Sequence, residues 1–475
     1  MAKKNTSALE DKLSLKQESS WLKINKKQEK EIMDFAEGYK DFLGRAKTER
    51  EVVDYIIITA EKHGFKPIAK CKTLKPGDKI IITSMKKNAA LAVIGKAPVD
   101  DGLKILASHV DSPRIDLKQK PLYEDKDSEI ALFKTHYYGG LKKYQWVNVP
   151  LAIHGVISRA DGKVIDVNIG EDPGDPVFVI GDLEPHLSRK LQGKRDLFEG
   201  IKGEELRLIA GSIPMKSEKN AKDSLKLNIL NILNKKYGIV EEDLISAELE
   251  VVPAHAPRDV GLDRSMVGGY GQDDRICAYT SLMAICHVKN PTKTSLTLFF
   301  DKEEVGSVGA TGAQSDFMEY AVGEILERMV KDYRHATLRR ALGNSRAISG
   351  DVDAGMHPIF KEVYEKQNAA RLGHGIVLCK FGGARGKAGA NDASAEFVGE
   401  LRRLFNKKKI PWQYAELGRV DEGGGGTVAR FMAEYIMEIV DCGPPLLSMH
   451  SPFEIANKAD LYFSYLAYRE FQQAE

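Results

Sequence analysis

The chain has 475 residues, which is long enough for two domains and a large hydrophobic core. Hydrophobic residues make up 43% and charged residues 29%, as is ordinary for a globular protein. The formal net charge of +2 gives no electrostatic case for binding nucleic acid or a membrane surface, so we expect neither as a partner.

Cysteine use and the N-terminal segment bear on the compartment. The five cysteines are scattered and form no CxxC motif, so neither a disulfide framework nor a thiolate zinc site is indicated. The first 30 residues are rich in Lys and Glu and contain no apolar signal region. No apolar run approaches the roughly 20 residues that span a bilayer. We therefore expect a reducing, cytoplasmic protein.

Periodicity near the N-terminus predicts helices and then strands. Apolar residues at spacings of three and four predict a helix over 32–48. Residues 79–85 and 89–95 are typical of a pair of hairpin strands, and 103–108 of a buried strand. We assign residues 1–112 to the first part of a catalytic domain.

The pattern of apolar and polar residues changes after Pro113. Residues 151–158 and 163–170 predict a hairpin with Asp161 and Gly162 at its turn. The polar stretch 188–205 predicts a long exposed loop, of a kind that often serves function or assembly. We assign 113–255 to an inserted β-rich domain.

Strands and helices alternate in the remainder, 256–475, which we assign to the catalytic domain. Strands are predicted over 295–300, 346–351 and 375–381, and helices over 395–408, 427–440 and 459–473. This alternation predicts an α/β fold, a sheet with helices on its faces.

Acidic and histidine residues cluster at the ends of predicted strands. In open α/β sheets, sites collect at the carboxyl ends of the strands. Short motifs that follow strands, or lie in Gly- or Pro-rich loops, supply His109 and Asp111, Asp273 and Asp274, Glu303 and Glu304, Asp351 and Asp353, and His450. Successive strand side chains point to opposite faces, so Glu303 and Glu304 reach one site only if the strand has ended, which Gly306 permits.

Imidazole and carboxylate ligands without a thiolate suit zinc, manganese or cobalt. A pair of metals about 3.5–4 Å apart needs a bridging carboxylate, and a further carboxylate that is not a ligand must take the proton of the attacking water. The sequence has candidates for the metal ligands, for the bridging carboxylate and for the carboxylate that takes the proton.

The motifs HVDSP, GQDD, EEVGS, SGDVDA and MHSPFE, in this order, resemble those of the aspartyl aminopeptidase and aminopeptidase I family of dinuclear-metal exopeptidases. The resemblance implies a mixed-sheet, zinc-exopeptidase-like catalytic domain that removes the N-terminal residue of peptides with a free N-terminus. It implies two divalent metal ions per subunit, zinc first, with cobalt or manganese as alternatives. The implied ligands are His109 and Asp351 for one metal, Glu304 and His450 for the other, and Asp273 as the bridge.

The same resemblance implies further roles. Glu303 would be the general base, and Asp111 would orient His109 from behind. His154 falls on a family histidine that reaches a neighbouring subunit's site and helps to polarise the substrate carbonyl. The inserted domain would join dimers, and the dimers would assemble into a dodecamer, so a homo-oligomer is expected.

Some assignments leave alternatives open. Asp274 competes with Asp273 as the bridge, and Asp353 competes with Asp351 as a ligand. The stretch 380–397 departs from the form of the acid-specific members; Arg385 and Lys387 either pair with an acidic substrate side chain or lie on a solvated loop. The four glycines at 423–426 predict a backbone that passes close to substrate or metal, or a plain flexible loop.

Other functions remain as alternatives. A dipeptidase, carboxypeptidase or deacylase would use the same dinuclear scaffold. A non-catalytic assembly protein with a vestigial site is the alternative from a different class, and the complete ligand set argues against it.

Overall fold

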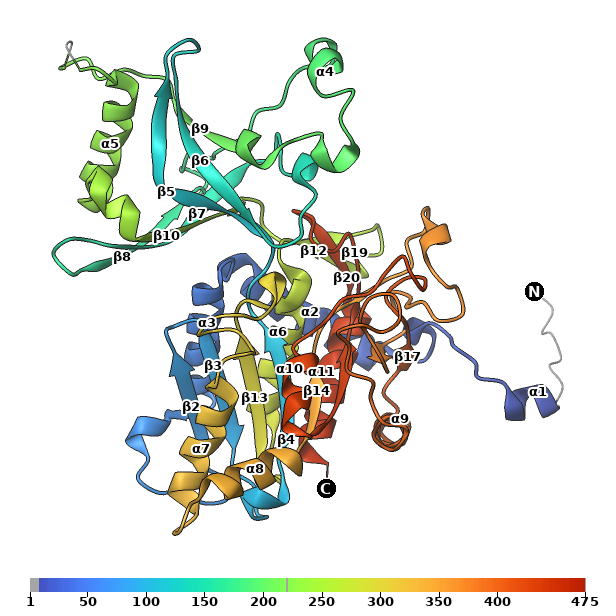
Figure 1. Ribbon diagram of the computed structural model, residues 1–475. Helices are drawn as coiled ribbons and strands as arrows, with labels where there is room; N and C mark the ends of the chain where they lie inside the picture. The colour runs from blue at the N-terminus through green and yellow to red at the C-terminus, as the bar shows by residue number, and fades with distance from the viewer. Residues whose placement is uncertain (1–7, 219–220, 475) are drawn as a thin grey trace.

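The larger of the two bodies in Figure 1 is built around a nine-stranded mixed sheet. The computed structural model describes residues 8–218 and 221–474. The strands follow the order β1 (Lys66–Pro67), β2 (Lys79–Ser84), β3 (Asn88–Val93), β13 (Ser295–Phe300), β4 (Lys104–His109), β14 (Arg346–Ser349), β18 (Glu438–Gly443), β16 (Ile376–Cys379) and β17 (Trp412–Tyr414). Strands β13, β4, β14 and β18 are parallel, so their carboxyl ends meet at one edge.

Helices cover both faces of this sheet. One face packs against α2 (Lys26–Arg45), α3 (Glu49–Lys62), α6 (Gln272–His287), α9 (Ala395–Lys408) and α11 (Lys458–Gln473). The other face packs against α7 (Phe317–Met329), α8 (His335–Gly343) and α10 (Ala429–Met432). The predicted α/β class with helices on both faces is confirmed.

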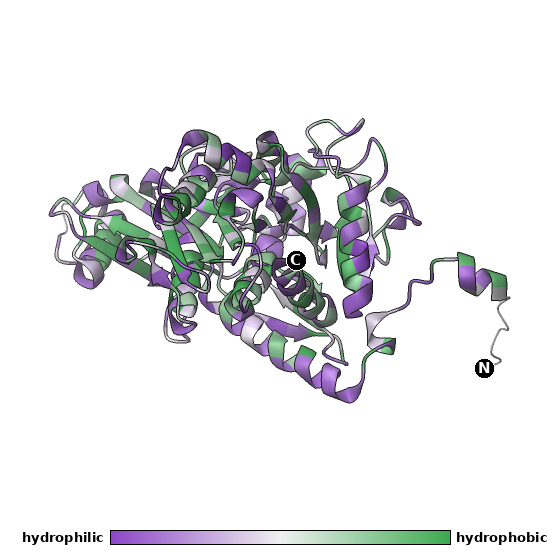
Figure 2. Ribbon diagram, turned by 90° about the horizontal axis from the view of Figure 1, so that it is seen from below, coloured by the Kyte–Doolittle hydropathy of each residue, from purple (hydrophilic) through white to green (hydrophobic). Residues whose placement is uncertain are grey.

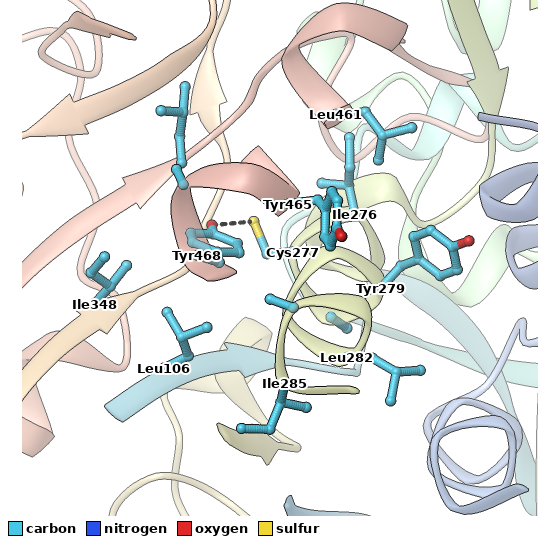
Figure 3. Packing of buried hydrophobic residues seen from close by; sticks show 14 of the residues in the cluster. Leu106, Ile276, Cys277, Tyr279, Leu282, Ile285, Ile348, Leu461, Tyr465 and Tyr468 are labelled. Carbon is cyan, nitrogen blue, oxygen red and sulfur yellow. Dashed lines mark hydrogen bonds between the residues drawn. The ribbon is translucent and has the colours of Figure 1, made fainter. Parts of the chain in front are cut away.

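Helix α6 lies at the centre of the first of these two cores. In Figure 3 its residues Ile276 and Leu282 lie among side chains of the sheet and of α11. Tyr468 of α11 donates a hydrogen bond of 2.6 Å to the carbonyl oxygen of Cys442, which ties α11 to β18. Because α6 is buried around almost its whole circumference, its N-terminal end is held rigidly at the carboxyl edge of the sheet.

Helices at the outside of the molecule are amphipathic. Figure 2 shows hydrophilic and hydrophobic residues side by side along them. Helix α2 begins with a capping box between Asn25 and Gln28, six residues before the start that periodicity predicts, because its first turn is polar. Helix α1 (Ala8–Leu13) extends away from both bodies (Figures 1 and 2).

The smaller body holds a six-stranded antiparallel sheet. Its strands follow the order β8 (Val164–Ile169), β7 (Leu151–Ser158), β10 (Ala247–Pro253), β5 (Arg114–Asp125), β6 (Ile130–Tyr138) and β9 (Arg207–Gly211). The predicted hairpin is present as β7 and β8. Helix α5 (Ser224–Tyr237), which the sequence analysis does not predict, packs on this sheet, and α4 (Pro185–Leu191) interrupts the exposed stretch predicted as a loop. The domain boundaries at 113 and 255 stay a prediction.

A third, five-stranded sheet lies beside the carboxyl edge of the large one. Its order is β11 (Arg258–Val260), β12 (Met266–Gly269), β20 (Glu454–Asn457), β19 (Pro445–Leu447) and β15 (Asp353–Ala354). Strand β12 leads into α6, β20 follows His450, and β15 follows Asp351. This sheet therefore brings three distant segments to one place.

The helix predicted over 427–440 is wrong in its second half. Helix α10 ends at Met432, Ile436 adopts a left-handed conformation, and β18 begins at Glu438. Strand β18 lies between β14 and β16 and is buried on both faces, so its apolar run carries no alternation. A short unalternating apolar run does not distinguish a strand from a helix.

No helix within residues 8–218 and 221–474 combines the length and the apolar character that crossing a bilayer requires.

Candidate metal centre

Three parallel strands deliver acidic or imidazole side chains to the carboxyl edge of the large sheet. Strand β4 ends at His109, β13 ends just before the turn that carries Glu303, and β14 ends just before Asp351. Register places Phe300 beside His109 and Ser349 beside Ala107. The side chains that follow these strands therefore meet above one edge, as expected for an open α/β sheet.

His109 is buried and faces two carboxylates. Its Nε2 lies 3.2 Å from Asp273 Oδ1 and 4.0 Å from Asp351 Oδ1. Its Nδ1 lies 3.0 Å from the carbonyl oxygen of Asp111, which accepts a hydrogen bond from a proton on Nδ1. That bond leaves Nε2 free to act as a ligand.

Asp273 lies between the two imidazoles. Its Oδ2 is 3.1 Å from His450 Nε2, while its Oδ1 faces His109. The hydroxyl of Ser112 donates a 2.6 Å hydrogen bond to the Asp273 carbonyl oxygen. Gly271, just before α6, has φ +73°, and a Cβ there would meet the Arg275 guanidinium, so only glycine allows this entry to the helix.

His450 completes the other side of the cluster together with Glu304. Its Nε2 lies 3.4 Å from Glu304 Oε2, and its Nδ1 lies 2.7 Å from the carbonyl oxygen of Gly140. Glu454 Oε1 accepts a 2.7 Å hydrogen bond from the His450 amide, which holds the backbone in its left-handed conformation at φ +65°. His450 thus repeats the arrangement of His109, with Nδ1 on a carbonyl and Nε2 toward the carboxylates.

A tight turn places Glu303 and Glu304 on the same side. Strand β13 ends at Phe300, and Lys302 and Gly306 both have positive φ, +73° and +91°. Asp111 secures this turn: its Oδ1 accepts from the Glu303 amide at 3.1 Å and its Oδ2 from the Glu304 amide at 3.2 Å. The strand has therefore ended before the glutamates, as predicted.

Two overlapping groups of side chains have the spacing of metal ligands. In each group the ligand atoms lie within 4.8 Å of one another; the groups are His109, Asp273 and Glu304, and His109, Asp274 and Asp351. Asp274 also accepts a 3.3 Å hydrogen bond from the His109 amide through Oδ2. Asp273 is the carboxylate that faces both imidazoles, whereas Asp353 belongs to neither group.

A profile of the family described as aminopeptidase I zinc metalloprotease (M18) matches residues 42–472. The chain belongs to the M18 family of aminopeptidases. A probable M18 family aminopeptidase 1 of Clostridium acetobutylicum is 51% identical over 95% of this chain and 97% of that relative. The crystal structure of an M18 aminopeptidase from Thermotoga maritima covers 97% of this chain and 100% of that chain, with 45% identity and a TM-score of 0.92.

The suspected family is thereby confirmed, and the chain is a metallopeptidase, a hydrolase that acts as an aminopeptidase. A yeast Ape1 dodecamer, 20% identical with a TM-score of 0.74, covers 92% of this chain and 96% of that chain and shares the fold.

Burial and mutual repulsion dominate the electrostatics of this M18 site. Burial raises the pKa of Glu303 to about 7 and raises the pKa of Glu304 and of Asp351 well above its usual range. Burial also works against ionised Asp273, but hydrogen bonds from His109 and His450 hold its pKa below the usual value. The protein alone thus leaves several carboxylates uncompensated, and a cation among them would stabilise the charged forms.

The residues present fit a resident metal. Ligand atoms about 2.1 Å from a tetrahedral zinc lie about 3.4 Å apart, which is close to the observed spacings of 3.1, 3.2 and 3.4 Å between imidazole nitrogens and carboxylate oxygens. Within residues 8–218 and 221–474, Glu304 Oε1 and Asp274 Oδ1 are buried without a hydrogen-bond partner. A divalent cation would satisfy such atoms.

His154 is not brought to this cluster. It lies on β7 with 2% of its surface exposed, and its ring nitrogens lie 2.8 Å from Glu51 Oε1 and 3.1 Å from Glu171 Oε1. Glu171 also pairs with Lys47 at 2.6 Å, so His154 belongs to a buried ion network between the two bodies. A role for His154 at a neighbouring subunit's site stays a prediction. It would require His154 to break its contacts with Glu51 and Glu171.

A cavity of about 240 Å³ opens beside the cluster. Asp273, Glu303, Glu304, Asp351 and His450 line one part of it. Glycines 424–426 line another, so the glycine-rich segment does pass close to the site. Lys387 and Arg385 are not among the lining residues; Lys387 pairs with Asp392 at 3.0 Å.

Sequence reasoning missed two residues that support the cluster. Buried Glu454 accepts hydrogen bonds from the amides of Gln272 and Asp273 as well as His450. Tyr138 donates a 2.7 Å hydrogen bond to Asp111 Oδ2. Glu454 ends the MHSPFE motif that carries His450, and its place in that motif is a signal in the sequence. Tyr138, from the inserted segment, has no such signal.

Asp111→Ala is expected to destabilise this M18 chain by about 3 kcal/mol or more, because two partly buried amides and the Tyr138 hydroxyl lose their acceptor, at about 1–3 kcal/mol for each unpaired group. Tyr138→Phe, which removes one neutral donor, is expected to cost about 1 kcal/mol. Urea unfolding followed by fluorescence measures both. Equal losses for the two variants would contradict the role given to Asp111.

Proposed function

We propose that the chain hydrolyses the N-terminal peptide bond of peptides by means of two divalent metal ions. His109 and Asp351 would hold one ion, Glu304 and His450 the other, and Asp273 would bridge them. The single observation that carries this proposal is the position of Asp273, with one oxygen toward each imidazole Nε2. Zinc is the first choice, and cobalt and manganese accept the same donors.

The metal pair would supply Lewis acidity for activating water and polarising the scissile carbonyl. Glu303 lines the same cavity and is not assigned to either ion, so it is free to accept the proton of the attacking water and to pass it to the leaving amine. Its position is fixed through its amide by Asp111. Asp111 also holds His109, with Oδ1 3.2 Å from Nδ1.

The small cavity favours an exopeptidase that takes a single residue. At about 240 Å³ it is smaller than the pockets of about 300–1,000 Å³ that hold drug-sized ligands. A dipeptidase, carboxypeptidase or deacylase on the same scaffold would accept N-blocked or dipeptide substrates, whereas an aminopeptidase requires the free amine. A preference for acidic N-terminal residues is not part of the proposal, because Arg385 and Lys387 do not line the cavity.

Glu303→Gln is expected to lower kcat by about 10²–10⁴-fold, since the amide cannot accept the proton. The variant should keep the metal content of the wild type, measured by plasma mass spectrometry, because Glu303 is not a proposed ligand. Glu396→Gln, on the exposed side of α9, is the matched control and should keep the wild-type rate. Normal turnover by Glu303→Gln would remove the base assignment.

His450→Ala is expected to lower the metal content from two ions to one per subunit, because one ion loses its only imidazole. His136→Ala, which removes an exposed histidine on β6, should retain both ions. Elemental analysis after dialysis against a metal-free buffer makes the comparison. Two ions retained by His450→Ala would show that its Nε2 is not a ligand.

We also propose that the chain forms a homo-oligomer joined through the inserted segment, a dodecamer built from dimers. Support comes from the open edge β8 of its sheet and from exposed apolar side chains of the inserted segment, Val164 at 60% and Ile213 at 65%. Exposed apolar surface next to an open edge is typical of an interface.

Light scattering is expected to give a particle of about twelve times the 52.7 kDa chain mass. Ile213→Asp should reduce that mass, because a charge would be buried in the interface. Leu262→Asp, at a fully exposed position of the large body, should not. A monomeric wild type would reject the proposal.

A further inference from the structure

Two carboxylates that the metal centre does not use line the same cavity. Asp353 stands on β15 and Asp441 on β18, and both lie among the cavity's lining residues. Asp353 is 5% exposed and Asp441 is 7% exposed. Neither belongs to the groups with metal-ligand spacing. Their presence therefore calls for an explanation other than the metals.

Asp353 has an oxygen with no partner. Its Oδ1 accepts a 2.7 Å hydrogen bond from the Ala354 amide. Its Oδ2 is buried and has no hydrogen-bond partner within the described residues. An unpaired buried carboxylate oxygen costs several kcal/mol by order of magnitude, so such an atom points to a missing donor.

Asp441 is held in place by neutral groups. Its Oδ1 accepts a 2.6 Å hydrogen bond from the Thr427 hydroxyl, which also lies 3.4 Å from the Ser349 hydroxyl. Across the part of the chain that the structure describes, no Lys, Arg or His nitrogen pairs with Asp353 or Asp441; Lys380 and Lys387 both pair with Asp392. The protein fixes this pair of acids without neutralising it.

The rest of the wall is largely apolar. Val377, Leu417 and Met449 line the cavity together with the two acids. A long aliphatic stem with a cation at its tip would match both features, since such side chains lay their methylene groups on apolar surface and keep the charged head on a polar partner. A carboxylate tip would instead face two acidic groups.

We propose that Asp353 and Asp441 form a subsite for a cationic side chain on the N-terminal residue of the substrate, so that lysine and arginine are preferred. This inference rests on the proposed function, because the subsite shares its cavity with Glu303 and the proposed ligands. The metal-loaded full chain should cleave lysyl-7-amido-4-methylcoumarin with a kcat/KM at least tenfold above that of the norleucyl compound. The glutamyl compound should be the poorest of the series.

The norleucyl comparison removes the charge from the substrate and leaves the protein intact, so it does not depend on the folding of a variant. Lysine acetylated at Nε is a second neutral substrate and should behave as norleucine does. Equal kcat/KM values for lysyl and norleucyl substrates, or a preference for glutamyl, would overturn the inference while leaving the aminopeptidase intact. No hydrolysis of any substrate would overturn the proposed function, and this inference with it.

Asp353→Asn and Asp441→Asn should each lower the lysyl-to-norleucyl ratio of kcat/KM at least fivefold. Asp127→Asn, which removes one exposed negative charge on the inserted segment, should keep the wild-type ratio. If these acids instead hold the substrate's α-ammonium, the two substitutions should lower the lysyl and norleucyl rates by the same factor. That outcome would also overturn the subsite.

Discussion

Repulsion between buried carboxylates at the carboxyl edge of the large sheet is the constraint on which this structure depends. Asp273, Glu303, Glu304 and Asp351 lie around two imidazoles with little access to water. Such a group is unfavourable for the protein alone, and a fold holds it only through other interactions. In this fold the other interactions are hydrogen bonds from backbone amides to two carboxylates. Asp111 accepts from the turn that carries the two glutamates, and Glu454 accepts from the first turn of α6 and from His450.

The two supporting carboxylates, Asp111 and Glu454, fix different parts of the backbone around the site. Asp111 links β4 to the turn after β13, which are neighbours in the large sheet. Glu454, at the start of β20, links the five-stranded sheet to the first turn of α6. Each accepts hydrogen bonds from backbone amides, so each fixes the backbone that carries the clustered side chains. The side chains that have metal-ligand spacing are therefore held in place by contacts within the protein.

The sequence predicted the parts of this site that depend on local signals. Apolar runs located β4 and β13, and the rule that sites follow strand ends then placed His109 and Glu304 together. Gly306 permits the turn that brings both glutamates to one side. The choice of Asp273 over Asp274 needed the family resemblance, because both acids stand at the same helix start and only their orientation separates them. Tyr138 and the buried pairing of His154 depend on how the inserted segment folds back, which no local pattern encodes.

The wrong helix prediction over 427–440 also arises because the local sequence does not encode tertiary contacts. The strand β18 is buried on both faces because of its neighbours, and those neighbours come from residues more than fifty positions away in the chain. A local apolar run cannot report that environment, and it is the strand that carries Asp441. Asp441 was therefore not identified from the sequence, while the proposed metal ligands were. His109, Glu304 and Asp351 follow recognisable strand ends, whereas Asp441 lies inside a strand whose existence depends on tertiary pairing.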